Sequence, residues 1–279
     1  MLRTIAQHGL KLNRTISNVF PILSAPASRN LSTYIKYGQN DTEKEYLQSK
    51  NNYSAENCRK ILDDNIISVI GYGSQGRSQA LNLKDNGFNV ILGIRELGNS
   101  WEKAVEDGWI PDENLFDINE ASRKGDVIKY LLSDAGQIDQ WTVINNNLAP
   151  GDTLYFSHGF GIHYHKYTNI IPPEDVNVVL VAPKCSGRTV RNNFLNGRGF
   201  NSSYAIHQDC GNAFDKTMAL SFGIGNNLLF ETTFEKEVYS DLLGERCVLM
   251  GLIQGAFLAQ YNILRKRGHS PTEAYNETV

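Results

Sequence analysis

Three glycines, Gly71, Gly73 and Gly76, follow a short apolar run at 66–70 with the spacing G-x-G-x-x-G. In this pattern the first glycine permits a tight turn, the second lets the backbone approach a pyrophosphate, and the third lets a helix pack closely on the strand. The amides at the start of a helix, together with its positive dipole end, favour a phosphate group. Because a helix-like stretch follows at 74–86, we predict a dinucleotide-binding turn rather than a turn without a ligand.

The end of the second apolar run, at 89–94, bears on which dinucleotide is favoured. An acidic residue at this position binds the ribose hydroxyls of NAD, whereas an arginine accommodates the 2′-phosphate of NADP. Arg95 and Glu96 stand here side by side, so the two neighbours indicate opposite cofactors. The following Gly98-Asn99-Ser100 adds a hydroxyl and backbone amides suited to a phosphate, and we therefore favour NADPH. In the alternative interpretation, Arg95 is only a surface cation.

Polar side chains follow the later apolar runs at the points where those runs end. Ser133 and Asp134 follow the third run, His158 follows the fourth, and Lys184 follows the fifth. Ligands of open α/β sheets bind beyond the carboxyl ends of the strands. A histidine at such an end, followed by Gly159, is placed to face a nicotinamide and a substrate, although a lone histidine is as often structural. Lys184, at the end of the fifth run, is likewise either a functional residue or a structural one.

Asp241 and Glu245 are four residues apart in a helix-like stretch, so both carboxylates lie on one helix face. Two carboxylates in apolar surroundings repel each other and lose hydration unless a cation lies between them. Oxygen-only ligands suit Mg²⁺, and Glu277, on the next expected helix, is a candidate third ligand. The alternative is a solvated acidic face, which is the commoner role for an isolated pair with this spacing.

The surrounding pattern is that of an α/β fold. Five near-continuous apolar runs alternate with helix-like stretches and lie at 66–70, 89–94, 126–132, 153–156 and 176–181. Such runs predict a Rossmann-type, doubly wound parallel sheet that is covered on both faces. Two later runs, at 203–206 and 227–230, are candidates to extend this sheet.

A helical region follows the sheet. Residues 235–267 form a long helix-like stretch that is apolar over most of its circumference, which predicts burial against other helices. Ser270, Pro271 and Glu273 then fit an N-cap, a first-turn proline and a capping box. The chain therefore begins an all-helical domain after its sheet.

Composition narrows the classes of function. The 279 residues carry a net charge of −3 and a pI of about 6.1, which disfavours a sequence-independent nucleic-acid binder. No run of about 18 purely apolar residues occurs, so we expect no membrane-spanning helix. The four cysteines form no C-x-x-C pair, which disfavours a disulfide scaffold and a structural zinc site.

The first 40 residues contain basic residues and several serines but no Asp or Glu. This composition is typical of an organellar transit peptide and not of a secretory signal. We therefore divide the chain into three parts, with a mitochondrial transit peptide at 1–40, an NADP-binding domain at 52–232 and a helical metal and substrate domain at 233–279.

Together, these residues resemble the ketol-acid reductoisomerase family, in particular its fungal mitochondrial form. The resemblance covers about residues 66–279 and is carried by GYGSQG at 71–76, YFSHGF at 155–160, VAPKC at 181–185, SDLLGE at 240–245, GHSP at 268–271 and EAYNE at 273–277. It implies a Rossmann domain joined to a knotted, all-helical domain. It also implies conversion of 2-acetolactate to 2,3-dihydroxy-isovalerate in valine synthesis, and of 2-aceto-2-hydroxybutyrate in isoleucine synthesis.

The resemblance also implies roles for individual residues. Asp241, as a bridging ligand, Glu245 and Glu277 would hold two Mg²⁺ ions that act as Lewis acids on the substrate. His158 and Lys184 would lie near the reacting groups, where NADPH delivers its hydride. We assign cofactor binding to Gly71, Tyr72, Gly73, Ser74, Gln75, Gly76, Arg95, Ser100, Leu132, Ser133, Asp134 and Gly159, with Arg95 and Ser100 at the 2′-phosphate.

Members of this family continue past the equivalent of Val279, with a fourth metal carboxylate and a serine that contacts substrate. We therefore expect a shortened form with an incomplete second metal site and exposed apolar surface, which favours association into a homo-oligomer. Two alternatives are a metal-free NADP-dependent hydroxyacid dehydrogenase that uses His158, and a catalytically incomplete NADP-binding subunit. The expected partner is a small acetohydroxyacid, with no nucleic acid and no membrane, and the expected location is the mitochondrial matrix.

Overall fold

The structure is a computed structural model and describes residues 33–37 and 43–278. The expected transit peptide lies outside these residues except near its end, where Thr33–Tyr37 forms strand β1. β1 pairs antiparallel with β2, Glu43–Ser49, and β2 pairs in turn with β10, Asn226–Glu231. The polar composition of this segment hides the hairpin from the sequence, because β2 is defined by its pairing with β10 and not by an apolar run.

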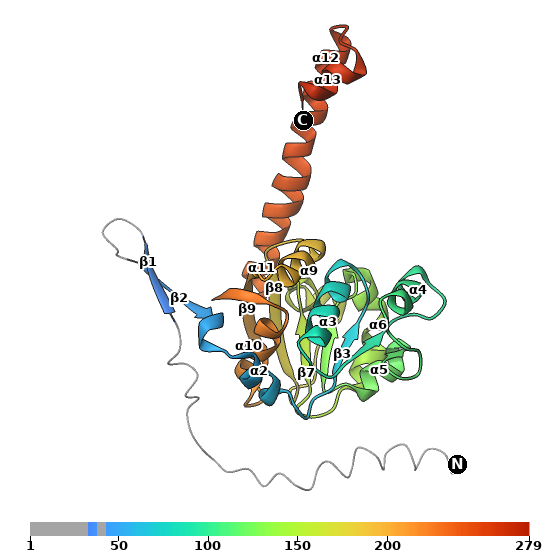
Figure 1. The fold of residues 1–279 in the computed structure, drawn as a ribbon, viewed down its shortest axis with the longest axis vertical. Helices are drawn as coiled ribbons and strands as arrows, with labels where there is room; N and C mark the ends of the chain where they lie inside the picture. Colours follow the sequence, from blue (N-terminus) through green and yellow to red (C-terminus); the bar gives the residue numbers. More distant parts are fainter. Residues whose placement is uncertain (1–32, 38–42, 279) are drawn as a thin grey trace. The chain divides into compact units, whose positions relative to one another are not determined.

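The described residues form a ten-stranded sheet in the order β1-β2-β10-β9-β8-β7-β6-β3-β4-β5 (Figure 1). The remaining strands are β3 Ile67–Ile70, β4 Val90–Gly93, β5 Leu115–Phe116, β6 Val127–Tyr130, β7 Thr153–Phe156, β8 Asn177–Pro183 and β9 Phe200–Gln208. The strands from β3 to β8 run parallel, as predicted.

The expectation of a purely parallel sheet is wrong beyond β8. β9 runs antiparallel to β8, with Ser202 paired to Pro183, so β9 begins beside the end of β8 and runs back along it. The connection through α9, Gly187–Leu195, therefore starts and ends at the same edge of the sheet. β10 is parallel to β9 and antiparallel to β2, which makes the sheet mixed.

Helices cover both faces of the parallel strands. Along β3, Ile67 and Val69 belong to one cluster of buried apolar side chains, whereas Ile70 belongs to a second. Helices α3, Ser74–Asp85, and α10, Ala213–Gly223, contribute to the first cluster. The second receives side chains from α5 (residues 118–124) and α6 (residues 134–147). This alternation confirms the doubly wound arrangement.

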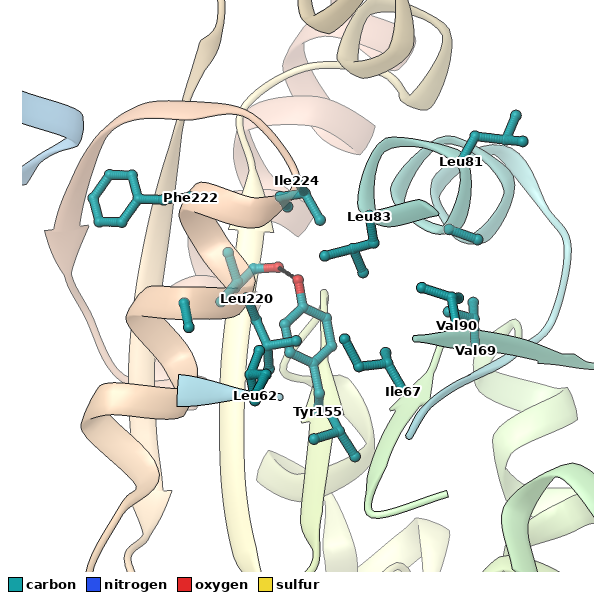
Figure 2. Close-up of a cluster of buried hydrophobic side chains, with 14 of the residues drawn as sticks. Leu62, Ile67, Val69, Leu81, Leu83, Val90, Tyr155, Leu220, Phe222 and Ile224 are labelled. Carbon is teal, nitrogen blue, oxygen red and sulfur yellow. Dashed lines mark hydrogen bonds between the residues drawn. The ribbon is translucent and has the colours of Figure 1, made fainter. Parts of the chain in front are cut away.

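Figure 2 shows the first cluster, in which the ring of Tyr155 lies between Ile67 of β3 and Leu220 of α10. The Tyr155 side chain is fully buried, and its hydroxyl donates to the carbonyl oxygen of Val181 at 3.3 Å. The shorter helices around the sheet are η3 Lys50–Asn52, α2 Ala55–Ile61, α4 Asn99–Glu106, α7 Phe160–His163 and α8 His165–Thr168.

The helical region after the sheet is one continuous helix, followed by a turn and a short second helix (Figure 1). Its segments are α11 Phe234–Asp241, the π-helical η4 Leu242–Leu252, α12 Ile253–Lys266 and, after the turn, α13 Pro271–Asn276. The predicted capping box is confirmed at the start of α13. Ser270 Oγ accepts from the Glu273 N–H, and the Glu273 carboxylate accepts from the Ser270 N–H at 2.7 Å.

The burial of this long helix differs from the expectation. No side chain between Leu242 and Glu273 is buried in the described chain, and Leu252 is 68% exposed. Phe234–Lys266 is also long and apolar enough to cross a membrane, with a mean hydropathy of 1.5 over an 18-residue window. Glycines, two glutamines and an asparagine interrupt the apolar run but leave its mean hydropathy high. Core helices of soluble proteins share this length and composition, so the finding alone assigns no membrane.

Candidate nucleotide and metal site

The glycine turn between β3 and α3 has the geometry that its spacing predicts. Gly71 has a φ of +102°, and a Cβ there would lie 2.7 Å from the carbonyl oxygen of Leu131. A Cβ on Gly76 would lie 2.2 Å from the carbonyl oxygen of Gly71, whereas a Cβ on Gly73 would meet no atom within 4 Å. The fold therefore requires the first and third glycines, and the second borders open space that a pyrophosphate can enter.

A cavity of about 330 Å³ opens beside this turn. Residues from separate elements line it, among them Gly71, Tyr72, Arg95, Gly98, Ser100 and Leu132. Gly98 is the N-cap of α4, so the first amides of that helix lie at the cavity together with the Arg95 side chain. A helix N-terminus and a guanidinium form a suitable setting for an anion such as a 2′-phosphate.

A partly buried polar cluster fixes Tyr72 in the turn. The Tyr72 hydroxyl donates to Asp107 Oδ2 at 2.8 Å and accepts from the Trp109 indole N–H at 2.9 Å. Asp107 also accepts two hydrogen bonds from Arg77, at 2.6 and 2.7 Å, which hold the pKa of the Asp107 carboxyl below its usual range. Burial and the Asp107 carboxylate raise the pKa of Tyr72, so its hydroxyl stays protonated. The turn is thereby tied to the end of α4.

At the end of β7, α11 brings two carboxylates to His158. The Nδ1 atom of His158 lies 3.1 Å from Glu237 Oε2 and 3.6 Å from Asp241 Oδ2. Lys184 Nζ lies 3.9 Å from Glu237 Oε1. Within the described residues, His158, Glu237 and Asp241 form a group whose ligand atoms all lie within 4.8 Å of one another. Three residues predicted to act in the site, His158, Lys184 and Asp241, are thus brought together.

Opposing influences act on His158. Burial lowers its pKa, but the hydrogen bond to Glu237 and the charges of Glu237 and Asp241 outweigh burial, so the pKa is raised above its ordinary value. Glu237 engages Nδ1, while Nε2 is buried and has no hydrogen-bond partner in the described part of the chain. Because Glu237 holds Nδ1, Nε2 is the ring nitrogen left to meet a ligand.

Glu237 is absent from the residues that we predicted, although it is the hub of this cluster. It is 2% exposed, and its Oε2 also accepts from the Gly159 N–H at 2.7 Å. A Cβ on Gly159 would lie 2.3 Å from the carbonyl oxygen of Phe234, so only glycine allows the end of β7 to approach α11 this closely. The recurrence of acids every four residues, at Glu237, Asp241 and Glu245, is the sequence feature that could have found it.

The other predicted residues lie at strand ends of the same sheet. Ser74 begins α3, and Gln75 Nε2 donates to the carbonyl oxygen of Cys185 at 3.1 Å, beyond β8. Ser133 follows β6 and caps α6, because its Oγ accepts from the Gly136 N–H at 3.3 Å. Asp134 is the first residue of α6. The contacts of these residues, and of Gly159, with a cofactor stay predictions.

Two predicted metal ligands lie outside the His158 group. Glu245 is half-buried in η4, and Glu277 is exposed at the end of α13. The backbone carbonyl of Glu277 accepts from Gln260 Nε2 at 2.7 Å, which ties α13 to α12. Their roles as metal ligands therefore stay predictions.

The fold and the site define a dinucleotide-binding α/β protein in which a helical region supplies carboxylates to the ends of the strands. Residues 61–228 match the family model of the acetohydroxy acid isomeroreductase NADPH-binding domain. Residues 234–279 match the model of the ketol-acid reductoisomerase C-terminal domain. The chain belongs to the ketol-acid reductoisomerase family, as its motifs indicate.

Curated relatives agree with this assignment. A ketol-acid reductoisomerase (NAD(+)) of Desulfosudis oleivorans is 56% identical over 236 residues, which cover 84% of this chain and 67% of the relative. The mitochondrial ketol-acid reductoisomerase of Neurospora crassa is 54% identical, and the match covers 85% of this chain and 59% of the relative. The mitochondrial enzyme of Saccharomyces cerevisiae is 54% identical, and the match covers 79% of this chain and 57% of the relative. The chain thus spans less than two thirds of the length of these fungal relatives.

Solved structures place the fold in the same family. An NADH-preferring ketol-acid reductoisomerase from an uncultured archean matches with a TM-score of 0.76 at 37% identity, over 84% of this chain and 70% of that chain. A semialdehyde dehydrogenase NAD-binding protein from Cupriavidus necator shares the fold alone, with a TM-score of 0.57 at 17% identity, over 76% of this chain and 78% of that chain. Because relatives are named for either nicotinamide cofactor, the family supports a nicotinamide dinucleotide without choosing between them.

Proposed function

We propose that this chain carries the cofactor-binding part and some of the metal-binding part of a magnesium- and NADPH-dependent ketol-acid reductoisomerase. The proposed reactions convert 2-acetolactate to 2,3-dihydroxy-isovalerate and 2-aceto-2-hydroxybutyrate to 2,3-dihydroxy-3-methylvalerate, in valine and isoleucine synthesis. The cluster of His158, Lys184, Glu237 and Asp241 is the observation that carries the proposal, because it gathers a proton donor, a cation and carboxylates at the strand ends.

His158 is suited to handle a proton in this reaction. Glu237 orients the imidazole through Nδ1, and the buried Nε2 has no partner among the described residues. Nε2 is therefore the ring nitrogen left to donate to a substrate oxygen that gains negative charge, which is the role of a positioned general acid. Lys184, with a side chain that is 37% exposed, adds a positive charge beside the same carboxylate.

The carboxylates fit Mg²⁺ better than the imidazole does. Mg²⁺ prefers oxygen ligands, and the His158 Nδ1 is already held by Glu237 at 3.1 Å. Asp241, whose side chain is 22% exposed, is the accessible carboxylate of the cluster. Asp241, with Glu245 and Glu277 by family resemblance, would hold the ions. Bound Mg²⁺ supplies Lewis-acid polarisation of the substrate carbonyl and hydroxyl.

The proposal is tested by NADPH oxidation with 2-acetolactate, measured with and without Mg²⁺. We expect the chain to bind NADPH. Any turnover should depend on Mg²⁺ and be lost in Asp241→Asn, while NADPH binding survives the substitution. Turnover without metal would favour a simple hydroxyacid dehydrogenase instead. NADPH binding without turnover under any condition would favour a catalytically incomplete subunit. Equal loss of NADPH binding and turnover in Asp241→Asn would give Asp241 a structural role.

Location and assembly belong to the same proposal. Two fungal relatives are named mitochondrial, which supports a mitochondrial location for this chain and, by extension, the matrix. The acid-free segment at 1–31 would then direct import, and protein purified from the matrix should lack Met1. The exposed apolar residues of η4 and α12 support a homo-oligomer.

A further inference from the structure

A buried side-chain amide lies behind the site. Gln79 is on α3, one turn after Gln75, and is 0% exposed. Its Nε2 donates to Ser157 Oγ at 3.0 Å and to Gln75 Oε1 at 3.1 Å. Its Oε1 accepts from the Tyr155 hydroxyl at 2.9 Å. The amide is therefore fully used, and it holds three side chains in fixed relation to one another.

The partners of Gln79 lead directly to the predicted site. Ser157 is the neighbour of His158 at the end of β7. Gln75 belongs to the glycine turn, and its own Nε2 donates to the carbonyl oxygen of Cys185, the neighbour of Lys184. One buried amide thus connects the turn after β3 with the segments that follow β7 and β8.

Tyr155 anchors this connection in the core. Its ring lies inside the first apolar cluster (Figure 2), and Lys129 Nζ lies 3.6 Å from the ring centroid. Its hydroxyl is shared between Gln79 and the carbonyl oxygen of Val181 on β8. Hydrogen bonds in a low-dielectric interior are costly to displace, so those of the buried Gln79 amide and Tyr155 hydroxyl hold their partners in place.

We propose that Gln79 is a positioning residue that fixes His158 and Lys184 relative to the nicotinamide half of a dinucleotide bound at the glycine turn. This role rests on the proposed function, because it assumes that these two side chains act at that half. The adenosine half is expected at the cavity beside Arg95, and no hydrogen-bond partner of Gln79 in the described chain lines that cavity. Gln79 should therefore influence one half of the ligand and not the other.

The test compares two ligands in the 279-residue chain by calorimetry. Gln79→Leu removes the donors to Ser157 and Gln75 and the acceptor of Tyr155. We expect the Kd for NADPH to rise about tenfold, whereas the Kd for adenosine 2′,5′-bisphosphate, which lacks the nicotinamide half, changes less than about twofold. Where turnover is measurable, kcat should fall about 100-fold, because displacement by about 1 Å has that effect on a reacting pair.

A matched control separates positioning from lost stability. Asn82 is another fully buried amide of α3; it donates to the carbonyl oxygen of Ile224 and accepts from Arg191, each at 2.8 Å. Asn82→Leu should lower the thermal stability to a similar extent and leave both Kd values unchanged within about twofold. Gln79→Glu keeps the acceptor for Tyr155 but loses the donors to Ser157 and Gln75, so it should not restore the NADPH affinity.

Ser157→Ala tests the same connection should Gln79→Leu fail to fold. It removes one hydrogen bond and should weaken NADPH binding selectively, by about threefold. Equal weakening of both ligands, no weakening of either, or the same pattern in Asn82→Leu would overturn the positioning role. Acetolactate-dependent turnover that needs no Mg²⁺ would overturn the proposed function, and the comparison of the two ligands would still decide the role of Gln79.

Discussion

The sheet region and the long C-terminal helix treat their apolar side chains in opposite ways. In the sheet, Leu92 of β4 is 0% exposed, and helices cover both faces of the parallel strands. In the helix from Phe234 to Lys266, Leu252 is 68% exposed and Leu249 is 56% exposed. Both regions contain many apolar side chains, so the difference lies in whether other described elements pack against them.

The candidate site lies where these two regions meet. Phe234 and Val238 of α11 are buried against the sheet, and the buried Glu237 lies on the same helix. One turn later, at Asp241, the helix leaves the buried environment. The carboxylates therefore combine a rigid attachment, through Glu237, with an accessible oxygen ligand at Asp241.

The largest expected effect contrasts the two regions directly. Leu92→Ala should lower the free energy of unfolding by about 3 to 4 kcal/mol, because it leaves a cavity in a closed core. Leu252→Ala removes the same atoms from an exposed position and should change it by less than about 0.5 kcal/mol. Urea unfolding monitored by circular dichroism measures both. Comparable losses would mean that the helix is covered in solution.

A smaller loss in the free energy of unfolding, of about 2 to 3 kcal/mol, is expected from a substitution in the glycine turn of the sheet region. Gly76→Ala places a methyl group against the carbonyl oxygen of Gly71 and should destabilise the fold by overpacking. Gly73→Ala meets no atom within 4 Å and should leave stability unchanged while weakening NADPH binding. The pair is measured by thermal unfolding and ligand titration. Normal NADPH binding by the Gly73→Ala variant would show that the pyrophosphate does not bind at this turn.

Lys129 is a charged-type side chain in the otherwise largely apolar core of the sheet region. Its amine is fully buried and has no hydrogen-bond partner among the described residues. Burial lowers its pKa well below the ordinary value, so the unfolded chain binds the extra proton. Stability should therefore rise with pH up to about 10.4, the pKa of an unfolded lysine. Lys129→Met should stabilise the chain by about 1 to 2 kcal/mol near neutral pH and flatten this dependence.

Unfolding curves at several values between about pH 7 and pH 9 measure this prediction. Lys60→Met, at an exposed position of α2, is the control and should leave both stability and its pH dependence unchanged. A destabilised Lys129→Met variant would show that the amine contributes more through Tyr155 than its burial costs.

The smallest expected effect concerns cofactor choice. Arg95→Ala should reduce the preference for NADPH over NADH about tenfold, because it removes the guanidinium at the expected 2′-phosphate. Glu96→Ala, at the adjacent exposed position, should not reduce that preference. Fluorescence titration with both cofactors provides the measurement. Equal affinities for NADH and NADPH in the unmodified chain would contradict the assignment to NADPH.

The sequence by itself determined the elements whose cause is local. The strands β3, β4, β6, β7 and β8 follow from apolar runs, the turn at Gly71 from residue spacing, and the start of α13 from Ser270 and Glu273. Each depends on residues within a few positions of one another, so its physical cause is visible in a short window. Membership of the family followed from the combination of such windows.

Only the tertiary structure decided which distant residues meet. The direction of β9 depends on how α9 returns to the sheet edge, and β2 is defined by a partner strand near the other end of the chain. Glu237 reaches His158 across 79 positions because Gly159 lets α11 approach the end of β7. Burial, pairing and raised pKa values are properties of contacts, and contacts between distant residues are set by packing of the whole core, which no local pattern encodes.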